Sequence, residues 1–400
     1  MKSKKQFKAL LIGKSFELTT APLPLLKRAD FDVDLIAFFG ISARDSSFRS
    51  IYCINSIGQL AEILPGLLSQ SNYDLVVVGD DETLLDIHGS NLSAELKMQI
   101  LPISSINGEC HLYSKIGLST LLQKSGITTP RFEVAKNEVE LLSLAEKVGY
   151  PVIVKIDYSG GGGGVFQCNS MGEIFTHLKS YKYPLLVQQF IEGDMLDLSA
   201  FYQNGQLIHF TYSKFERTVG GSFGPSSVRS YQQLAIINRE VFEELQRLGM
   251  ALSAHGFVNI SVMHSIKDGK RYYFEADMRP NVWVDYGKYI GNDAAIAISE
   301  YFTNGQTLNY PPVRNPQYPQ TLLIPYILRL SLWELLLNKY KCWDYIEGWS
   351  QLFLQIPSRV DSVFTALSIR FIKPRISSSV WSKLKYLHSQ VVMGVYSKLR

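Results

Sequence analysis

Short apolar segments alternate with stretches of helical spacing along the first hundred residues of the chain. Strand-like runs cover residues 7–12, 32–39 and 74–79, and a helical pattern covers residues 21–29. The third run contains four consecutive apolar residues, which is typical of a parallel sheet covered on both faces. Strands that alternate with helices indicate an open α/β fold. We therefore predict an N-terminal α/β domain with a parallel sheet over residues 1–105.

The next two hundred residues mix strand pairs with helices, as expected of an α+β domain over residues 106–310. Asp268 and Gly269 stand between two strand-like runs, 257–265 and 271–276, in the pattern of a hairpin turn. The helices expected here cover residues 114–125, 138–148, 171–180 and 238–255, and the further strands cover residues 152–156, 165–169 and 183–189.

The composition changes in the last ninety residues, which we expect to form a helical extension over residues 311–400. Amphipathic spacing predicts helices at residues 328–341 and 380–396. Eleven Lys or Arg stand against four Asp or Glu from residue 315 onward. We favour a helical cap packed on the rest of the protein, and the alternative is a basic surface for a partner protein or a membrane.

Overall composition is that of a globular protein, because 46% of the residues are hydrophobic and 19% are charged. A net charge of +4 gives no reason to expect nucleic acid as a partner. Four well-separated cysteines and seven scattered histidines predict neither disulfides nor a zinc site. No apolar run is long enough for a membrane span, and no signal peptide is evident, so we expect a cytoplasmic protein.

A lysine at the end of a strand precedes five consecutive glycines. Lys155 lies in the run Val152–Ile156, and residues 160–164 are all glycine. Glycines let backbone N–H groups approach phosphate oxygens closely, and a lysine adds positive charge. A flexible linker is the alternative, but strand-like sequence lies on both sides of the glycines. The segment therefore predicts a hairpin that binds a nucleotide triphosphate.

The second hairpin carries two carboxylates and an arginine at alternate positions. Glu275, Asp277 and Arg279 share one face of an extended segment because side chains alternate along a strand. Carboxylates suit Mg²⁺, and an arginine suits a phosphoryl group in transfer. In isolation, a surface ladder of salt bridges would be the simpler interpretation.

These motifs lie within about residues 106–305, and their types and order along the chain resemble those of the ATP-grasp superfamily. The likeness is to carboxylate–amine ligases and to the ATP-binding domain of the carbamoyl phosphate synthase large chain. It implies two lobes, about residues 106–187 and 188–310, that hold ATP between them. It also implies Mg²⁺ as the metal, with Mn²⁺ as a substitute.

The resemblance assigns roles residue by residue. Lys115 and Lys155 match the phosphate-binding lysines, Glu275 and Asp277 match the metal ligands, and Arg279 matches the catalytic arginine. The glycine loop and the hinge between the lobes complete the ATP site that it implies. These residues are Gly161, Gly162, Gly163 and Gly164 in the loop, and Gln189, Phe190 and Ile191 at the hinge, whose backbone would bind adenine.

Three positions depart from the superfamily pattern. Ser261 stands where a glutamate is usual, and Asp277 stands where an asparagine is usual. Met195 stands where an acidic residue usually holds the ribose, which leaves Asp194 or Asp197 for that role.

Two arginines lie between the lobe motifs. Arg217 precedes a Gly-Gly-Ser turn, and it resembles a residue that binds a carboxylate substrate; Arg229 is a second candidate. Both arginines could instead form structural ion pairs.

The function implied by this resemblance is that of an ATP-dependent ligase. Such an enzyme activates a small carboxylate as an acyl phosphate and joins it to an amine, and some members form homodimers. Two alternatives stay open. One is an ATP-grasp phosphotransferase that stops after phosphorylation, and the other is a non-catalytic nucleotide-binding scaffold with an altered metal site.

Overall fold

The structure is a computed structural model that describes residues 6–40, 46–105, 111–158, 163–177, 182–307 and 312–345. The chain forms two compact units, Met1–Leu323 and Ile324–Arg400. The finer division near residues 105, 187 and 310 stays a prediction. Within the described ranges, no helix has the length and apolar composition needed to cross a lipid bilayer.

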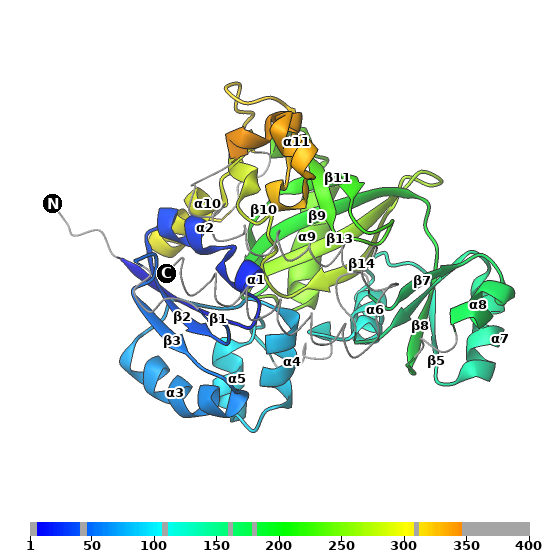
Figure 1. Cartoon of the computed structure of the whole chain (residues 1–400), viewed down its shortest axis with the longest axis horizontal. Helices are drawn as coiled ribbons and strands as arrows, with labels where there is room; N and C mark the ends of the chain where they lie inside the picture. The colour runs from blue at the N-terminus through cyan, green and yellow to red at the C-terminus, as the bar shows by residue number, and fades with distance from the viewer. Residues whose placement is uncertain are drawn as a thin grey trace, which may run out of the picture. The chain divides into compact units, whose positions relative to one another are not determined.

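A four-stranded parallel sheet forms the N-terminal part of the first unit, with the strand order β3-β2-β1-β4 (Figure 1). This sheet confirms the predicted open α/β fold. Sequence patterns missed β3, whose four residues are only partly buried. The strands are β1 (Phe7–Gly13), β2 (Phe31–Ala37), β3 (Ser50–Cys53) and β4 (Leu75–Val78). The helices are α1 (Phe16–Thr20), α2 (Leu23–Arg28), α3 (Ile57–Gln70), α4 (Asp81–Gly89) and α5 (Ala94–Ile100).

The next part, which we call the first lobe, is a four-stranded antiparallel sheet with the order β5-β8-β6-β7. Helices α7 and α8 pack on this sheet, as Figure 1 shows. The strands are β5 (Phe132–Ala135), β6 (Val152–Ile156), β7 (Val165–Cys168) and β8 (Leu185–Gln189). The helices are α6 (Lys115–Lys124), α7 (Glu138–Val148) and α8 (Met171–His177).

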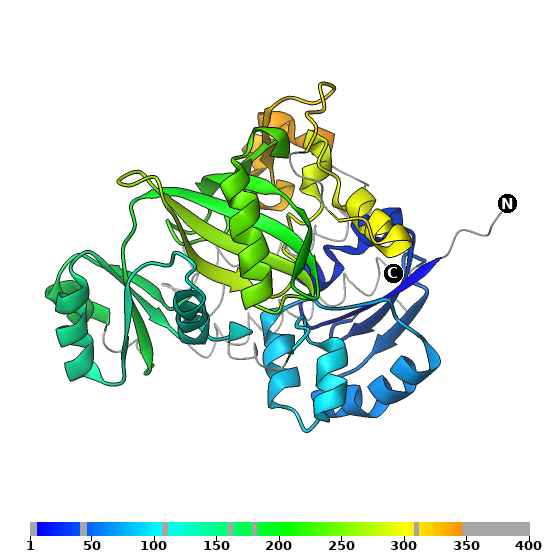
Figure 2. The ribbon, with the colours of Figure 1, turned by 180° about the vertical axis from the view of Figure 1, so that it is seen from behind.

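A larger sheet, which we call the second lobe, has the order β14-β13-β9-β11-β12-β15, with β10 paired to β9. The amphipathic helix α9 covers one face of this sheet (Figure 2). The strands are β9 (Gly193–Gln203), β10 (Gln206–Phe210), β11 (Tyr212–Thr218), β12 (Ser226–Gln232), β13 (Gly256–Ser265), β14 (Arg271–Asp277) and β15 (Thr321–Pro325). The helices are η3 (Leu234–Ile236), α9 (Arg239–Ala251), η4 (Tyr286–Ile290) and α10 (Ala294–Asn304).

Two hydrophobic cores run from the N-terminal sheet into the second lobe. One of them contains Leu10 and Ile12 of β1 together with Leu198 of β9 and Ile260 of β13. The second joins the opposite face of the N-terminal sheet to α10. The sheet of the first lobe, with α7 and α8, has a separate core around Val154, whereas Leu118 and Leu122 of α6 belong to the first of the shared cores. The N-terminal sheet and the second lobe are therefore packed as one body, although the first lobe lies between them in the sequence.

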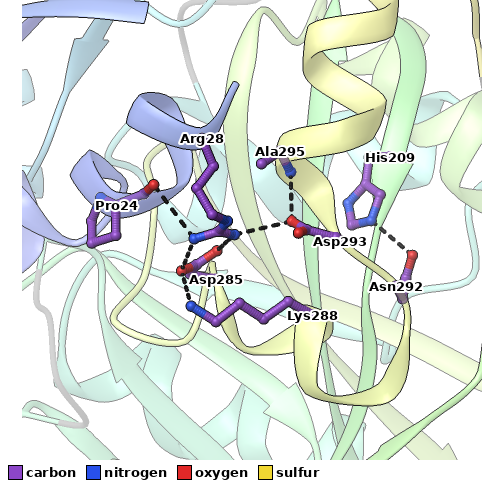
Figure 3. A network of polar contacts seen from close by, with 8 residues as sticks. All are labelled: Pro24, Arg28, His209, Asp285, Lys288, Asn292, Asp293 and Ala295. Carbon is purple, nitrogen blue, oxygen red and sulfur yellow. Dashed lines mark hydrogen bonds and ion pairs between the residues drawn. The ribbon is translucent and has the colours of Figure 1, made fainter. Parts of the chain in front are cut away.

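A polar network reinforces this packing (Figure 3). Arg28 of α2 donates to the two oxygens of Asp285 over 2.9 and 2.6 Å and to Asp293 over 3.0 Å. Lys288 donates to Asp285 over 2.7 Å. Nearby, the buried ring of His209 contacts Asn292 over 2.8 Å. One guanidinium thus connects an N-terminal helix to the segment that follows β14 in the second lobe.

The described part of the second unit corrects one prediction. Instead of a continuous helix at residues 328–341, it has three short ones: η5 (Ile327–Arg329), α11 (Leu332–Leu336) and η6 (Lys339–Tyr345). Asn338, Tyr340 and Lys341 have φ angles of 45°, 59° and 52°, and these left-handed conformations interrupt the helix. The helix expected at residues 380–396 lies outside the described residues.

Candidate functional site

Two rows of polar side chains cross adjacent strands of the second lobe. Glu275 of β14 pairs in register with Ser261 of β13, which in turn pairs with Asp197 of β9. One step along, Asp277 pairs with Asn259. Side chains that are directly opposite in a sheet share one face. Ser261, which stands where a glutamate is usual, therefore lies beside Glu275. Asn259 lies beside Asp277, which stands where an asparagine is usual.

Asp277 and Arg279, whose side chains are 23% and 11% exposed, form a charged group with a helix of the N-terminal domain. One amino group of Arg279 donates to Asp277 over 3.0 Å and to Asp81 of α4 over 2.6 Å. Burial raises the pKa of Asp277 to about 8, with a contribution from nearby Glu275 and with Arg279 acting in the opposite direction. Ionising Asp277 beside Glu275 is therefore unfavourable in the unliganded protein, and a bound cation would offset that cost.

Lys155 lies at the end of β6 with its side chain 7% exposed. Its ammonium is 4.7 Å from the centroid of the Phe274 ring. Burial lowers the pKa of Lys155 to about 8; Glu275 opposes this shift, and Lys115 adds to it. Among the described residues, Lys155 has no hydrogen bond or salt bridge to a carboxylate. A buried ammonium without a carboxylate partner is suited to bind an anionic ligand.

Asp157 positions Lys115 relative to β6. Ser114 caps the N-terminus of α6, and its hydroxyl donates to Asp157 over 2.9 Å. The N–H of Ile116 donates to the same carboxylate over 2.8 Å. Lys115 begins α6, and its own N–H approaches the carbonyl of Asp157 at 3.5 Å. Sequence analysis missed Asp157, although its position directly after the lysine strand was a usable signal.

A cavity of about 260 Å³ brings together four of the residues expected from sequence. These are Lys115, Glu275, Asp277 and Arg279. None of the hinge residues lines it. The other lining residues come mainly from α4 and from the start of α6, and sequence analysis assigned them no role: Asp81, Glu82, Leu85, His111, Leu112, Tyr113, Ser114, Leu118, Tyr158 and Ala276.

The hinge is partly committed to contacts within the protein. The N–H of Gln189 donates to the carbonyl of Arg131 over 2.8 Å, and that of Phe190 donates to Pro151 over 3.3 Å. Of the three expected hinge residues, Ile191 is the one whose N–H makes no described hydrogen bond. In the glycine loop, Gly161 and Gly162 lie outside the described residues, whereas Gly163 and Gly164 lie within them.

Asp194 and Asp197, the two candidates for holding the ribose, differ in environment. Asp194 is partly exposed and pairs with Lys214 over 2.8 Å. Asp197 is 1% exposed, and burial raises its pKa. It forms an ion pair with Arg229 over 2.5 Å and accepts from Asn281 over 3.2 Å. Asp194 is therefore the more accessible candidate.

The two candidate arginines lie apart from the cavity lining. Arg229 is 4% exposed, and its guanidinium lies between the rings of Phe215 and Trp283, at 4.7 and 4.6 Å. Its ion pair with Asp197 agrees with the structural interpretation. Arg217 of β11 donates to Ser227 over 2.7 Å, and two strands separate β11 from β14 in the sheet.

The donor set fits Mg²⁺ together with a phosphate ligand. Glu275 and Asp277 supply oxygen atoms on one face of β14. Among the described residues, neither this site nor any other brings three His, Cys, Asp or Glu side chains together in a metal-binding group. Mg²⁺ is commonly held by one or two carboxylates and completed by substrate phosphates and water. This arrangement suits a metal–nucleotide complex better than a resident structural metal.

Residues 114–207 match the family model of the RimK-like ATP-grasp domain. Over 203 residues, the chain is 24% identical to the carbamoyl phosphate synthase large chain of Deinococcus radiodurans. This match covers 48% of the chain and spans only 20% of the length of that relative.

Two solved structures share the fold. An L-amino acid ligase from Bacillus licheniformis is 16% identical, with a TM-score of 0.57 and coverage of 74% of each chain. The biotin carboxylase domain of the Hydrogenobacter thermophilus 2-oxoglutarate carboxylase, solved with MgADP, ADP and bicarbonate, is also 16% identical. Its TM-score is 0.59, with coverage of 80% of this chain and 74% of that one. The resemblance to the ATP-grasp superfamily noted in the sequence is thus confirmed, and residues 114–207 are the part of the chain that matches an ATP-grasp family model.

Proposed function

We propose that the chain is an ATP- and Mg²⁺-dependent ligase that activates a small carboxylate and joins it to an amine. The observation that carries the proposal is the buried ammonium of Lys155, which lacks a carboxylate partner among the described residues and lies near Glu275. A triphosphate supplies the anion that the buried ammonium of Lys155 lacks, and Lys115 adds a second positive charge to the same site. The metal supplies charge neutralisation and fixed geometry for the phosphates when it is bound.

In the proposed reaction, a carboxylate oxygen of the acid attacks the terminal phosphorus of ATP. A new O–P bond forms as the bond to the departing ADP breaks, which gives an acyl phosphate. The amine nitrogen then attacks the acyl carbon, inorganic phosphate leaves, and the nitrogen loses a proton. Arg279 is suited to stabilise negative charge on the transferred group. Lys115 and Lys155 hold the phosphates, and Glu275 and Asp277 hold the metal.

Other residues have supporting roles in the proposal. The hinge at Gln189, Phe190 and Ile191 faces adenine, and Asp194 takes the ribose. Arg217 stays a proposed contact for the acid. The glycine loop, which includes Gly163 and Gly164, covers the phosphates and excludes the water that would hydrolyse the acyl phosphate. Carboxylate–amine ligation is also consistent with the name of the L-amino acid ligase from Bacillus licheniformis, which shares the fold.

The first test is a calorimetric and thermal-shift titration with ATP, with and without Mg²⁺. We expect a Mg²⁺-dependent stabilisation, because a ligand that binds the native state raises its apparent stability. Lys155→Met should abolish it, and Lys147→Met is the matched control, since Lys147 lies on α7 and pairs with Glu133. If wild type showed no ATP-dependent shift, the ligase proposal would be contradicted.

Catalysis is tested by incubating the protein with MgATP, a panel of carboxylic acids and hydroxylamine, which traps acyl phosphates as hydroxamates. We expect ADP and a hydroxamate in equal amounts with the correct acid. A stable phosphorylated product that does not react with hydroxylamine would favour the phosphotransferase. ATP binding without ADP release from any acid would favour the nucleotide-binding scaffold.

A further inference from the structure

His111 is the least exposed polar residue of the cavity lining. It is 2% exposed, and both ring nitrogens lack a hydrogen-bond partner among the described residues. Burial lowers the pKa of the imidazole to about 4, so the ring is neutral at physiological pH. A neutral imidazole offers one donor and one acceptor. Leaving both unused in a buried position is costly, which makes His111 a candidate ligand contact.

The cavity around His111 lies toward the reacting end of the proposed nucleotide site. Arg279, Asp277 and Glu275 line it, whereas Lys155 and the hinge do not. The space that it offers beyond the metal ligands is therefore suited to the substrates that receive the phosphoryl group, rather than to the adenosine. A second wall of the cavity, apart from β14, comes mainly from α4 and from the segment that leads into α6.

Charge on this wall favours a cation. A helix N-terminus ordinarily attracts anions, but Asp80 caps α4 by accepting from the N–H of Thr83 over 2.9 Å. Asp81 and Glu82 then add two negative charges, with side chains 42% and 70% exposed. Arg279 engages one oxygen of Asp81, and Lys14 engages one oxygen of Glu82. Each carboxylate keeps its other oxygen outside these ion pairs.

The remainder of the wall is apolar and aromatic. Leu85 of α4 lines the cavity with its side chain 42% exposed, and Tyr158 lines it at 57% exposed. The rings of Tyr113 and Tyr158 are stacked, with centroids 5.8 Å apart. Partly exposed large side chains grouped in a cavity are suited to an apolar ligand body.

From this combination, and on the basis of the proposed ligase function, we infer that the wall formed by α4 and His111 binds the amine substrate, an ammonium compound with an apolar or aromatic side chain. Asp81 and Glu82 attract the ammonium, and His111 accepts a hydrogen bond from one of its N–H groups. Leu85, Tyr113 and Tyr158 contact the side chain. A carboxylate in the same position would be repelled by Asp81 and Glu82.

Three probes of similar shape and different charge test this assignment. They are phenethylamine, 2-phenylethanol and 3-phenylpropionate, each titrated by calorimetry with and without Mg²⁺ and a non-hydrolysable ATP analogue. We expect binding in the order phenethylamine, phenylethanol, phenylpropionate. Ethylamine should bind at least about tenfold more weakly than phenethylamine, because it lacks the ring that the apolar wall would contact. Equal or stronger binding of phenylpropionate would overturn the assignment, as would no binding of phenethylamine.

Variants connect the binding to His111. His111→Leu should weaken phenethylamine about tenfold, as expected when a buried hydrogen-bond acceptor is lost. His111→Gln keeps an acceptor and should retain most of the affinity, which also serves as a control for folding. His255→Gln is a matched control outside the cavity and should change nothing. Wild-type affinity in His111→Leu would contradict the assignment.

The two proposals fail separately in this design. Loss of nucleotide binding contradicts the ligase function, and it is measured with the nucleotide analogue alone. Loss of phenethylamine binding contradicts only the amine assignment. Because neither ring nitrogen of His111 hydrogen-bonds to a proposed metal ligand among the described residues, each His111 variant should bind the analogue as wild type does.

Discussion

The ammonium of Lys155 in the first lobe lies 4.7 Å from the ring centroid of Phe274 in the second lobe. Phe274 immediately precedes Glu275, so this cation–π contact brings the candidate phosphate lysine to the candidate metal strand. A contact of this kind stabilises a cation less than a salt bridge with good geometry. The lysine is therefore held in place and yet remains able to bind a stronger anionic partner.

Replacing Lys155 should have opposite effects on stability and on binding. Its folded pKa, about 8, is below the usual 10.5, so the unfolded chain binds more protons between these values. The stability of the wild type should then rise as pH increases from about 8 to 10.5. Lys155→Met should be more stable than wild type at pH 7, and this difference should vanish above pH 10.5, as measured by urea unfolding. The same variant should lose ATP binding. If Lys155→Met were less stable than wild type at pH 7, this would contradict the inference that the charge of Lys155 is buried without a compensating partner.

Neutralising the two carboxylates of β14 should abolish turnover and preserve the fold. The folded pKa of Asp277, about 8, is above its usual 3.8, so the ionised form costs stability that is fully felt above pH 8. We expect Asp277→Asn to be at least as stable as wild type at pH 8 without metal. The Glu275→Gln and Asp277→Asn double variant should show no Mg²⁺-dependent ADP release. Normal turnover in that variant would exclude these residues as metal ligands.

Breaking the contact between Arg28 and Asp285 should destabilise the first unit. Asp285 is 8% exposed and is engaged by both Arg28 and Lys288 (Figure 3). We expect Arg28→Met to cost about 2 kcal/mol, between the typical values for exposed and fully buried pairs. A double-mutant cycle with Asp285→Asn, followed by chemical unfolding, measures the coupling. Arg239→Met is the control, because its pair with Glu243 is solvent-exposed. Strictly additive effects would mean that the ion pair contributes no coupling energy.

The last residue of the glycine loop should tolerate alanine poorly. Gly164 has a φ of 75°, and a Cβ there would lie 3.0 Å from Cδ1 of Ile156. Gly126 has a φ of 66° with nothing near its Cβ position, which makes it a matched control for backbone strain alone. We expect Gly126→Ala to cost about 1 kcal/mol in chemical denaturation and Gly164→Ala to cost more. Equal losses of stability in the two variants would show that Ile156 can move away from the new Cβ at position 164 without an energetic cost.

Sequence patterns predicted most of the fold because its elements carry strong local signals. Helix α7 and strand β6 were predicted with the bounds that the structure gives them. The prediction of a continuous helix at residues 328–341 was wrong, because apolar spacing does not reveal that residues near Asn338 adopt left-handed backbone conformations. Strand β3 was missed because it is only four residues long and none of them is fully buried.

The candidate site was predictable only where its residues share a motif. Lys115, Glu275, Asp277 and Arg279 were identified from sequence, and the structure places them around one cavity. Asp81 lies far from these motifs in the chain, and His111, although it lies only four residues before Lys115, has no local pattern of its own. The proximity of Asp81 to β14 results from packing between the N-terminal domain and the second lobe, which the periodicity of the sequence cannot predict.

The separate core of the first lobe determines how this protein should exchange its amide hydrogens. Val154 and Val187 pack within that lobe, whereas β1 shares its core with β13. The first lobe can therefore open around its own small core without exposing the rest of the molecule. Amides of β6 and β8 should exchange through such local openings, and those of β1 and β13 only when the whole first unit unfolds. A nucleotide bound across the lobes would couple the two events into one cooperative transition.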